Sequence, residues 1–499
     1  MDKLKNITSV VWNILYKYCI LIVLPLSFVF FGLNKYPHLI SFSAAADTMM
    51  YSFFSVLVLY FIPRFKYDHF RSALITSWAG SLLLFYRDIY TSIARVPALD
   101  LIDYSPVNVG FSLVITLIVL LKLIRFSQIR IRQMYLYVNS LFAVFFLFNL
   151  VVFASLIIKP ATCLLDIQKV EFTENPKKEN PDVHCILFDE YAGIETMRLF
   201  HKYDNNDLNN ALNKLGFFVS NNSYSNYNST WISCASLLEM NYLDDNKLLT
   251  LNGNKKYLYG ESVIYNNNVF NYFKTSGYKT INNSFFNIKA DESNKKVIIN
   301  VDNNILKENT FFEYSKKSFL NHIPFNNIQI VLGTMMGAHY KYNQSVLNQF
   351  NYELTRVYND PKFVYTHLLM PHPPYLLSAK GVRNFREAYQ IKHEKQSEFY
   401  IEYVKETNKH IVRMVNSILS KNKNSIIIIT SDHGDRWSIN RNDNLDFNNF
   451  FAIYKPDRNY TGFTDSINTV NVFRTLLNNQ FGQNLPILES RRQDVLNLD

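Results

Sequence analysis

Residues 425–436 read SIIIITSDHGDR, and they are the stretch that predicts the fold class. The four isoleucines before Thr430 form a short β-branched run, which is typical of a strand buried on both faces of a parallel sheet. The loop after it places Asp432 beside His433, with Gly434 to bend the backbone. Ligands of open α/β sheets bind beyond the carboxyl ends of strands, so we interpret this loop as a metal site rather than a polar turn after a core strand.

A second apolar run ends in acidic residues in the same way. Residues 184–188, HCILF, are followed by Asp189 and Glu190. Two acids after a single strand more often form a solvated turn. If both runs are strands of one parallel sheet, however, their carboxyl ends share an edge, and these acids lie near Asp432 and His433. The pairing of the two motifs favours a site.

A hydroxyl-rich loop at 220–230 runs into a predicted helix. The apolar residues of the stretch 231–243 have the spacing of an amphipathic helix, with Ser229 or Thr230 at its N-cap. A hydroxyl there lies in the positive field of the helix N-terminus, which suits anionic groups and a nucleophile whose alkoxide needs stabilisation. Thr230 is therefore a candidate nucleophile, with simple helix capping as the alternative.

A proline-rich loop follows a further predicted strand in the stretch 363–375, FVYTHLLMPHPPY. The prolines on both sides restrict the backbone around His372, as expected for a side chain held for binding. His367 lies inside the strand and suits either a core histidine or a second site residue. Arg436 could pair with a phosphate or lie at the surface. His339 is an isolated histidine for which we expect a structural or solvated position.

Composition excludes some classes of function. The 499 residues carry a formal charge of +10 and 15% aromatic residues, but no recognisable nucleic-acid-binding motif, so no nucleic-acid partner is predicted. The cysteines are scattered and form no CxxC pair, so we expect at most one disulfide and no structural zinc site. They are Cys19, Cys163, Cys185 and Cys234.

The first third of the chain is apolar and predicts a membrane domain. Five stretches approach the roughly 20 residues that a helix needs to cross a bilayer. They lie near 9–33, 42–63, 72–93, 108–125 and 135–158. The third is the weakest because Trp78, Arg87 and Asp88 interrupt it, so four or five spans are expected. We predict a membrane domain at 1–160, a linker at 161–182 and a catalytic domain at 183–499.

Basic residues in the short loops predict the orientation. The segments before the first span, between the second and third, and between the fourth and fifth carry most of the lysines and arginines of this region, and such segments are usually cytoplasmic. An odd number of spans then places everything after residue 160 outside the cytoplasm. We expect a bacterial inner membrane protein with its catalytic domain on the periplasmic or extracellular side.

Taken together, the strand that ends in acids, Thr230 opening a helix with Ser233 three residues on, and the Ser-Asp-His-Gly loop at 431–434 resemble the alkaline phosphatase and sulfatase superfamily. More narrowly, they are similar to its membrane-anchored branch, the phosphoethanolamine transferases and lipoteichoic acid synthases. The resemblance covers roughly residues 183–480 and extends to the order of membrane bundle and extracytoplasmic domain. It implies an α/β/α sandwich with a largely parallel central sheet.

The resemblance also implies roles for single residues. Glu190 matches the first metal ligand, with Asp189 as a second or alternative ligand, and Asp432 and His433 match the remaining ligands. Thr230 matches the nucleophile that binds the metal and becomes phosphorylated.

Further roles follow for substrate contacts and for the metal. His372 matches a histidine that contacts the substrate phosphate or protonates the leaving oxygen, and His367 and Arg436 are further candidates for substrate binding. Carboxylates with an imidazole suit zinc or manganese best, ahead of magnesium or calcium.

Two departures from the family pattern bear on this assignment. The synthase branch typically has Glu-Ser where this chain has Asp189, Glu190 and Tyr191, which leaves open which acid binds. Sulfatases carry a modified cysteine in a Cys-x-Pro-x-Arg context, whereas Cys234 here is followed by neither the proline nor the arginine. Sulfate ester hydrolysis is therefore the weaker interpretation.

The predicted activity is transfer of a phospho-head-group, phosphoethanolamine or phosphoglycerol, through a phosphothreonine intermediate. The donor would be a membrane phospholipid, and the acceptor a cell-surface glycan or lipid. Two alternatives remain at this point: a membrane-tethered phosphoric or sulfuric ester hydrolase, and a non-catalytic scaffold that retains the fold.

Overall fold

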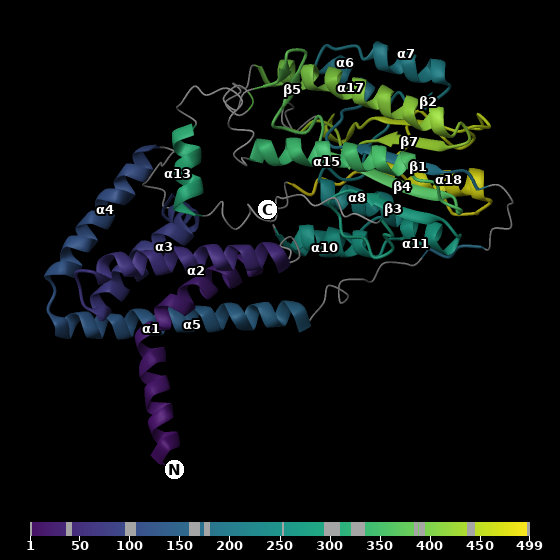
Figure 1. The fold of residues 1–499 in the computed structure, drawn as a ribbon. Coiled ribbons are helices and arrows are strands. Elements are labelled where there is room, and N and C mark those ends of the chain that lie inside the picture. Colours follow the sequence, from purple (N-terminus) through teal and green to yellow (C-terminus); the bar gives the residue numbers. More distant parts are fainter. Residues whose placement is uncertain are drawn as a thin grey trace. The chain divides into compact units, whose positions relative to one another are not determined.

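The computed structural model describes residues 2–35, 42–94, 106–158, 170–173, 180–251, 254–293, 310–320, 335–383, 388, 395–436 and 445–496. Its contacts divide the chain into two compact units, residues 1–160 with 300–325, and residues 161–299 with 326–499. After the roles predicted from the sequence, we call them the membrane unit and the catalytic unit. Figure 1 shows the helices of the first and the layered α/β arrangement of the second.

The membrane unit contains long apolar helices. They are α1 (Asp2–Lys35), α2 (Phe42–Arg64), α3 (His69–Ala94), α4 (Pro106–Arg125) and α5 (Gln128–Ile158). Within the described residues, four stretches are long and apolar enough to cross a membrane, and they lie in α1, α2, α4 and α5. The third predicted span, the weakest by sequence, corresponds to α3, which packs against the other four helices.

Asp88, one of the charged residues that interrupt the apolar sequence of α3, has a charged partner on a neighbouring helix. Asp88 forms an ion pair with Lys35 at the end of α1, with 2.7 Å between Nζ and Oδ1.

The segment 300–325, which lies between two strands of the catalytic unit in sequence, contributes α13 (Phe311–Leu320) to the membrane unit. Tyr314 of α13 is fully buried against Tyr86 and Tyr90 of α3. Sequence analysis did not anticipate this excursion of the chain.

The catalytic unit is built on one six-stranded sheet with the order β2-β8-β7-β1-β4-β3. The strands are β1 (Val183–Phe188), β2 (Phe218–Val219), β3 (Lys279–Asn283), β4 (Lys362–Leu368), β7 (Ile426–Thr430) and β8 (Phe451–Tyr454). The pairs among β3, β4, β1 and β7 are parallel, whereas β8 runs antiparallel to β7 and β2 antiparallel to β8. The predicted largely parallel sheet is confirmed.

Helices cover both faces of the sheet because alternate residues of the central strands point to opposite faces. Ile426 and Ile428 face a core shared with α8 (Thr230–Glu239), α10 (Asn254–Tyr265), α11 (Asn268–Thr275) and α18 (Val472–Phe481). Ile427 and Ile429 face a core shared with α7 (Asn206–Leu215), α15 (Met335–Thr355) and α17 (Gln396–Lys421). The isoleucine run of the sequence is thus buried on both sides, as its composition predicted.

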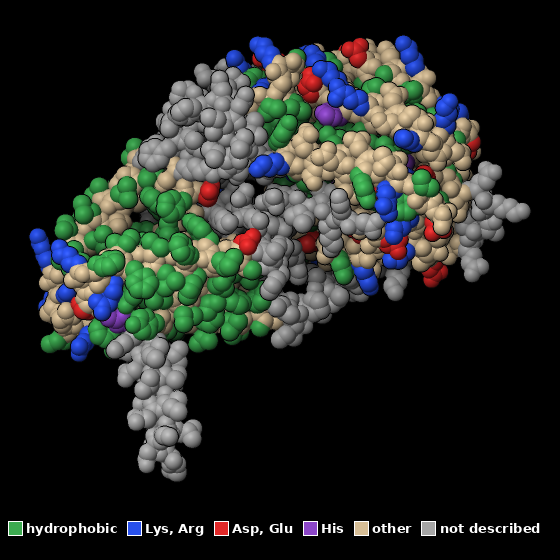
Figure 2. All heavy atoms as spheres, in the orientation of Figure 1, with side chains coloured by type: hydrophobic (Ala, Val, Ile, Leu, Met, Phe, Trp, Pro, Cys, Tyr) green, Lys and Arg blue, Asp and Glu red, His purple; other side chains and the backbone are tan. Residues whose placement is uncertain are grey.

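The surfaces of the two units differ in kind. The membrane unit shows large green apolar areas, whereas the visible face of the catalytic unit is mostly tan with scattered blue side chains (Figure 2). Exposed phenylalanines, leucines and valines, such as Phe54, Phe111 and Val151, account for the apolar surface. An exposed apolar belt of this kind is what a hydrocarbon environment requires.

Candidate active site

The topology brings three loops to one edge of the sheet. Strand β1 lies between β7 and β4, with Leu187 opposite Thr430 and Phe188 opposite Leu368. The three strands run in the same direction, so the loops after them begin side by side. The structure therefore brings the acids after the first strand close to the Asp-His pair after the later strand.

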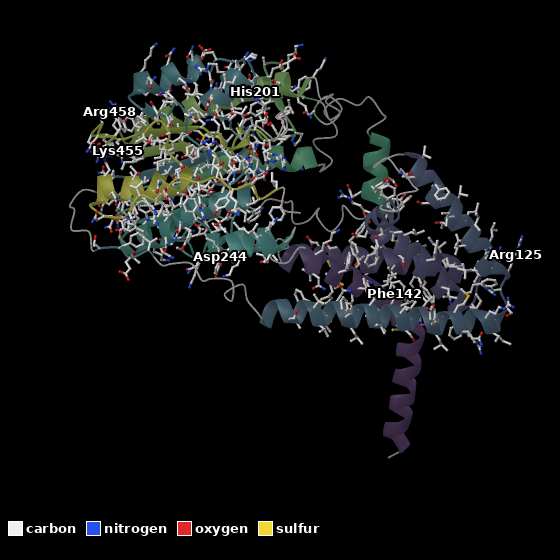
Figure 3. The ribbon with its side chains drawn as sticks, turned by 180° about the vertical axis from the view of Figure 1, so that it is seen from behind. Arg125, Phe142, His201, Asp244, Lys455 and Arg458 are labelled. Atoms are coloured by element: carbon white, nitrogen blue, oxygen red, sulfur yellow. The ribbon has the colours of Figure 1, made fainter. Side chains whose placement is uncertain are left out.

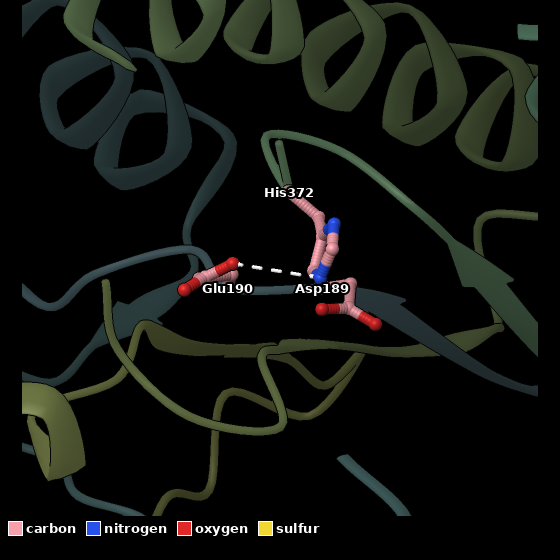
Figure 4. A group of neighbouring side chains, drawn as sticks. All are labelled: Asp189, Glu190 and His372. Carbon is pink, nitrogen blue, oxygen red and sulfur yellow. Dashed lines mark ion pairs between the residues drawn. The ribbon is translucent and has the colours of Figure 1, made fainter. Parts of the chain in front are cut away.

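Two groups of ligand-type side chains, all buried except the partly exposed His372, overlap at this edge. Asp189, Glu190 and His372 form one group, drawn in Figure 4, and Asp189, Asp432 and His433 form the other. Within each group one ligand atom from each residue lies within 4.8 Å of the others. Asp189 belongs to both groups, so the two acids after β1 both face the site and neither is excluded as a ligand.

The backbone around Glu190 is held in an uncommon conformation. Its φ angle is +63°, in the left-handed region that a non-glycine residue seldom adopts. The Glu190 N–H donates to Asp432 Oδ1 at 2.9 Å, and its carbonyl accepts a hydrogen bond from the Tyr400 hydroxyl at 2.9 Å. The chain reversal aims the carboxylate at the site, where Oε1 accepts from the Arg436 N–H at 2.9 Å.

Asp189 Oδ1 is buried without a hydrogen-bond partner among the described residues, whereas Glu190 Oε2 lies 3.7 Å from His372 Nε2 and Asp432 Oδ2 lies 3.1 Å from His433 Nε2. An unpaired buried carboxylate oxygen is costly, and such groups are normally satisfied or bound to a metal. The donor set of carboxylates and imidazoles therefore fits a divalent cation, and its nitrogen ligands suit zinc or manganese.

Thr230 lies beside this cluster at the start of α8. Ser229 is the N-cap residue, so Thr230 is the first helical residue. Its Oγ1 lies 3.4 Å from His433 Nε2. Ser233, one turn further on, donates from Oγ to the Asp432 carbonyl at 2.5 Å, which ties the helix to the loop after β7. The Thr-x-x-Ser spacing thus has a physical role, because the Ser233 hydrogen bond holds the start of α8, with Thr230, beside the loop after β7.

Opposing effects set the charge states of the site. Burial raises the pKa of Glu190 above its ordinary value, although Arg436 and two histidines act against this. Burial alone would also raise the pKa of Asp432, but the charge and hydrogen bond of His433 hold it well below its usual range. Burial and Arg436 would lower the pKa of His433, yet Asp432 keeps it above its ordinary value. Without a cation, Asp432 and His433 behave as a buried ion pair.

The three remaining predicted residues take different positions. His372 is partly exposed, and its Nε2 lies 3.7 Å from Glu190 Oε2 (Figure 4). Arg436 contacts Glu190 through Nε at 3.4 Å and donates to the Asn228 carbonyl at 3.0 Å. His367 is fully buried, with Nε2 3.2 Å from Asp189 Oδ2. His367 thus contacts Asp189 and is not exposed to solvent.

Some residues of this region were missed from sequence. His339 of α15, expected to be a structural or solvated residue, lies buried with its ring centroid 5.6 Å from that of His372. His201, labelled in the view from behind (Figure 3), stacks on Tyr400 and places Nε2 3.2 Å from Asp435 Oδ2. Neither histidine lies in a recognisable sequence motif. Each comes close to the site only because the folded chain packs a segment that is distant in sequence beside it.

Cys234 is not placed for catalysis. It is fully buried in the core under the sheet, and burial raises the pKa of its thiol well above the ordinary value. Reactive cysteines are accessible and have lowered pKa values. The position therefore agrees with the missing Pro and Arg of the sulfatase cysteine motif.

The family model described as Sulfatase matches residues 195–457, more than half of the chain. The chain belongs to the sulfatase family. The match begins just after the acids that follow β1 and includes Thr230, His372 and the loop after β7. This confirms the superfamily that the three motifs indicated, and with it an enzyme superfamily. Among curated proteins, no sequence matched this sulfatase-family chain.

Solved structures with a similar fold include membrane and periplasmic proteins. Full-length lipooligosaccharide phosphoethanolamine transferase A from Neisseria meningitidis is 13% identical, with 93% of this chain and 94% of that chain covered and a TM-score of 0.40. The C-terminal periplasmic domain of EcEptC from Escherichia coli, in complex with zinc, is 14% identical over 63% of this chain and 85% of that chain, with a TM-score of 0.41. The corresponding domain of EptC from Campylobacter jejuni is 12% identical over 61% and 91%, with a TM-score of 0.38.

Proposed function

We propose that this chain is a metal-dependent membrane phosphotransferase that moves a phospho-head-group, phosphoethanolamine or phosphoglycerol, from a phospholipid to a hydroxyl of a cell-surface glycan or lipid. The observation that carries the proposal is the position of Thr230. Its hydroxyl lies at a helix N-terminus, 3.4 Å from His433 Nε2, beside the buried carboxylates of Asp189, Glu190 and Asp432. A metal-assisted hydroxyl nucleophile requires this set of groups.

The reaction proceeds in two displacements at phosphorus. Thr230 Oγ gives up its proton to water and forms a bond to the donor phosphorus while the bond to the diacylglycerol oxygen breaks, and His372 gives a proton to that leaving oxygen. The acceptor hydroxyl then attacks phosphorus, loses its proton to His372, and breaks the bond to Thr230 Oγ. Thr230 recovers its proton from water, so the enzyme returns to its starting state.

The buried residues would hold the catalytic groups in place through both displacements. Asp189, Glu190, Asp432 and His433 would bind the cation, which would lower the pKa of the Thr230 hydroxyl and offset charge on the phosphoryl oxygens. His367 would orient Asp189, and Arg436, which already contacts Glu190, would face the phosphate through its partly exposed guanidinium.

The membrane helices support a lipid donor. Four stretches of the described chain are long and apolar enough to span a bilayer. A soluble phosphate ester would need no such anchor, whereas a phospholipid head group is available only at the membrane surface. The anchor therefore favours a lipid substrate over a freely diffusing ester.

The test is the intact mass of the full-length protein after incubation with mixed micelles of phosphatidylethanolamine or phosphatidylglycerol. We expect a mass increase equal to one phospho-head-group in the wild-type protein and none in Thr230→Ala. The matched control is Thr250→Ala, which removes an exposed hydroxyl at the end of α9 (Asp245–Thr250) and should still form the adduct.

Other outcomes separate the rival functions. Release of free phosphoethanolamine without an acceptor, at the rate of diacylglycerol formation, would favour a hydrolase. An adduct that persists in Thr230→Ala would contradict the assignment of the nucleophile. A wild-type protein that binds no divalent cation and forms no adduct would favour a non-catalytic scaffold.

A further inference from the structure

A polar groove lies between α15 and α17 on the catalytic unit. It has a volume of about 550 Å³. Its lining is Gln344, Leu347, Asn348, Phe350 and Asn351 from α15, and His410, Arg413, Met414, Asn416 and Ser417 from α17. A second hollow of about 500 Å³ runs along α15 and shares Gln344 and Asn348 with the groove. The two hollows therefore meet at these two amides.

The amides of the groove are available to a ligand. Asn348, Asn351 and Asn416 are exposed, and Gln344 is half-buried. Within the described part of the chain, none of these four side chains makes a hydrogen bond. Each amide carries donors and an acceptor, which match the hydroxyl groups of a sugar. Arg413 and His410 add positive or donor groups on the opposite wall.

Four residues of α15 form a stripe along one side of the helix, with an aromatic side chain at each end. Tyr340, Gln344, Asn348 and Tyr352 follow one another at intervals of four residues, so they lie along one side of the helix. From Tyr340 to Tyr352 the helix rises about 18 Å. Both tyrosines are half-buried; Arg356 lies over the Tyr352 ring, 5.7 Å from its centroid, and the exposed part of the Tyr340 ring can stack against the apolar face of a sugar.

The stripe starts at the active site. His339 directly precedes Tyr340, and its ring centroid lies 5.6 Å from that of His372. His339 is buried, and its Nδ1 has no hydrogen-bond partner among the described residues. A chain molecule lying along α15 would therefore have one end at the catalytic histidine, where an acceptor hydroxyl is needed.

The groove does not suit a protein partner. Its apolar members Phe350 and Met414 are buried in the core, and Leu347 is half-buried against it, so no large apolar side chain projects as an anchor. Protein interfaces depend on buried aromatic and aliphatic anchors at their centre. The visible face of this unit is correspondingly mostly tan rather than green (Figure 2).

We infer that the groove between α15 and α17 binds the acceptor, and that the acceptor is an oligosaccharide chain laid along α15 with its reacting hydroxyl at His372. The inference rests on the proposed transferase function, because it names the class of acceptor for that same site. It assigns Gln344 and Asn348 to acceptor recognition and leaves the donor half of the reaction to the residues around Thr230.

The test compares the double variant Gln344→Ala/Asn348→Ala with the wild-type protein and with Asn210→Ala, an exposed amide on α7 that lines neither hollow. Binding of delipidated lipopolysaccharide core oligosaccharide, and of a dextran oligosaccharide, is measured by calorimetry on the full-length proteins in detergent. We expect the Kd for at least one saccharide to rise by about tenfold or more in the double variant, and to stay unchanged in Asn210→Ala.

Donor cleavage is measured in parallel as diacylglycerol release from phosphatidylethanolamine, and it should be equal in all three proteins. Equal saccharide binding by wild type and double variant, or no binding of either saccharide by the wild type, would overturn the inference. If saccharide binding falls in the double variant while even the wild type releases no diacylglycerol, the groove assignment stands and the proposed transferase function fails.

Discussion

At the scale of single residues, the site is organised by what is buried without a partner. Asp189, Glu190 and Asp432 are buried at the same edge of the sheet, and within the described part of the chain Asp189 Oδ1 accepts no hydrogen bond. If these carboxylates only formed polar turns, they would remain in water, and there would be no desolvation penalty. Their burial instead indicates that the native protein completes them with a cation.

Replacing Asp432 by Asn tests this interpretation. The variant keeps the shape of the side chain but loses its charge, so we expect bound zinc or manganese to fall by about tenfold or more. The measurement is metal content of the purified full-length protein by mass spectrometry after dialysis. Asp207→Asn, an exposed acid on α7, is the control and should keep its metal. Equal metal in both variants would count against Asp432 as a ligand.

Glycine is required at position 434 by a close approach. A Cβ there would lie 2.5 Å from the Asn448 carbonyl oxygen, and the Gly434 N–H donates to the Asp446 carbonyl at 2.7 Å. The loop after β7 is thereby pressed onto the segment 445–448. The sequence indicated a bend at this glycine, but the neighbour that excludes a side chain belongs to a later segment of the chain.

At the scale of elements, helix ends are tied to one another by buried polar groups. Glu239, at the end of α8, accepts hydrogen bonds from the backbone and side-chain nitrogens of Asn268, the first residue of α11. The carboxylate thus caps the N-terminus of α11. Burial raises the pKa of Glu239 to about 8, although the Asn268 backbone N–H acts against the rise.

This raised pKa predicts the direction of a pH effect. Between the ordinary value of 4.5 and about 8, the folded protein holds a proton on Glu239 that the unfolded chain releases. The free energy of unfolding therefore falls as pH rises through this window, by at most about 1.4 kcal/mol per pH unit from this group. In Glu239→Gln the fall should be smaller by that amount.

The measurement is thermal unfolding of the full-length protein in detergent from pH 5 to pH 8, a range within the window just described. Glu261, whose pKa burial raises to about 7, contributes in the same direction, so the slope should decrease rather than vanish. Glu195→Gln, a partly exposed acid in the first turn of α6 (Ile194–Leu199), is the control. A slope equal to that of wild type in Glu239→Gln would show that this carboxyl is already ionised at low pH.

At the scale of the whole molecule, the sequence crosses between two units more than once. After the membrane helices the chain enters the catalytic unit, returns to the membrane unit at 300–325, and then re-enters the catalytic unit. The insertion contributes α13, whose Tyr314 is buried among aromatic residues of α3. The membrane unit is therefore completed by a segment that lies between β3 and β4 in sequence.

Orientation is the prediction that belongs to this scale. In a Cys163→Ser background, Asn210→Cys on the catalytic unit should react with a membrane-impermeant maleimide in intact spheroplasts. Lys66→Cys, in the basic loop after α2, should react only after the membrane is permeabilised, because basic loops stay in the cytoplasm. The described native cysteines, Cys19, Cys185 and Cys234, are buried or partly buried, and the unsubstituted background measures their signal. Labelling of Lys66→Cys in intact spheroplasts would contradict the predicted orientation of the chain in the membrane.

The sequence by itself determined the features that depend on local composition. The isoleucine run predicted a strand buried on both faces, and the apolar stretches predicted membrane helices. Side-chain period, span length and backbone freedom act within a few turns of chain, so they can be recognised without knowing the fold. The Asp-His pair beside acids after another strand could also be predicted, because parallel strands end at one edge.

Only the tertiary structure decided which residues complete the site. His339, His201 and Asn448 reach it from segments that carry no motif, and α13 leaves the catalytic unit for another core. Each of these contacts joins residues that are far apart in sequence. The free energy that it contributes depends on burial and on the direction in which a packed element points the side chain. These contacts form only when the sheet has been assembled and helices have covered its two faces.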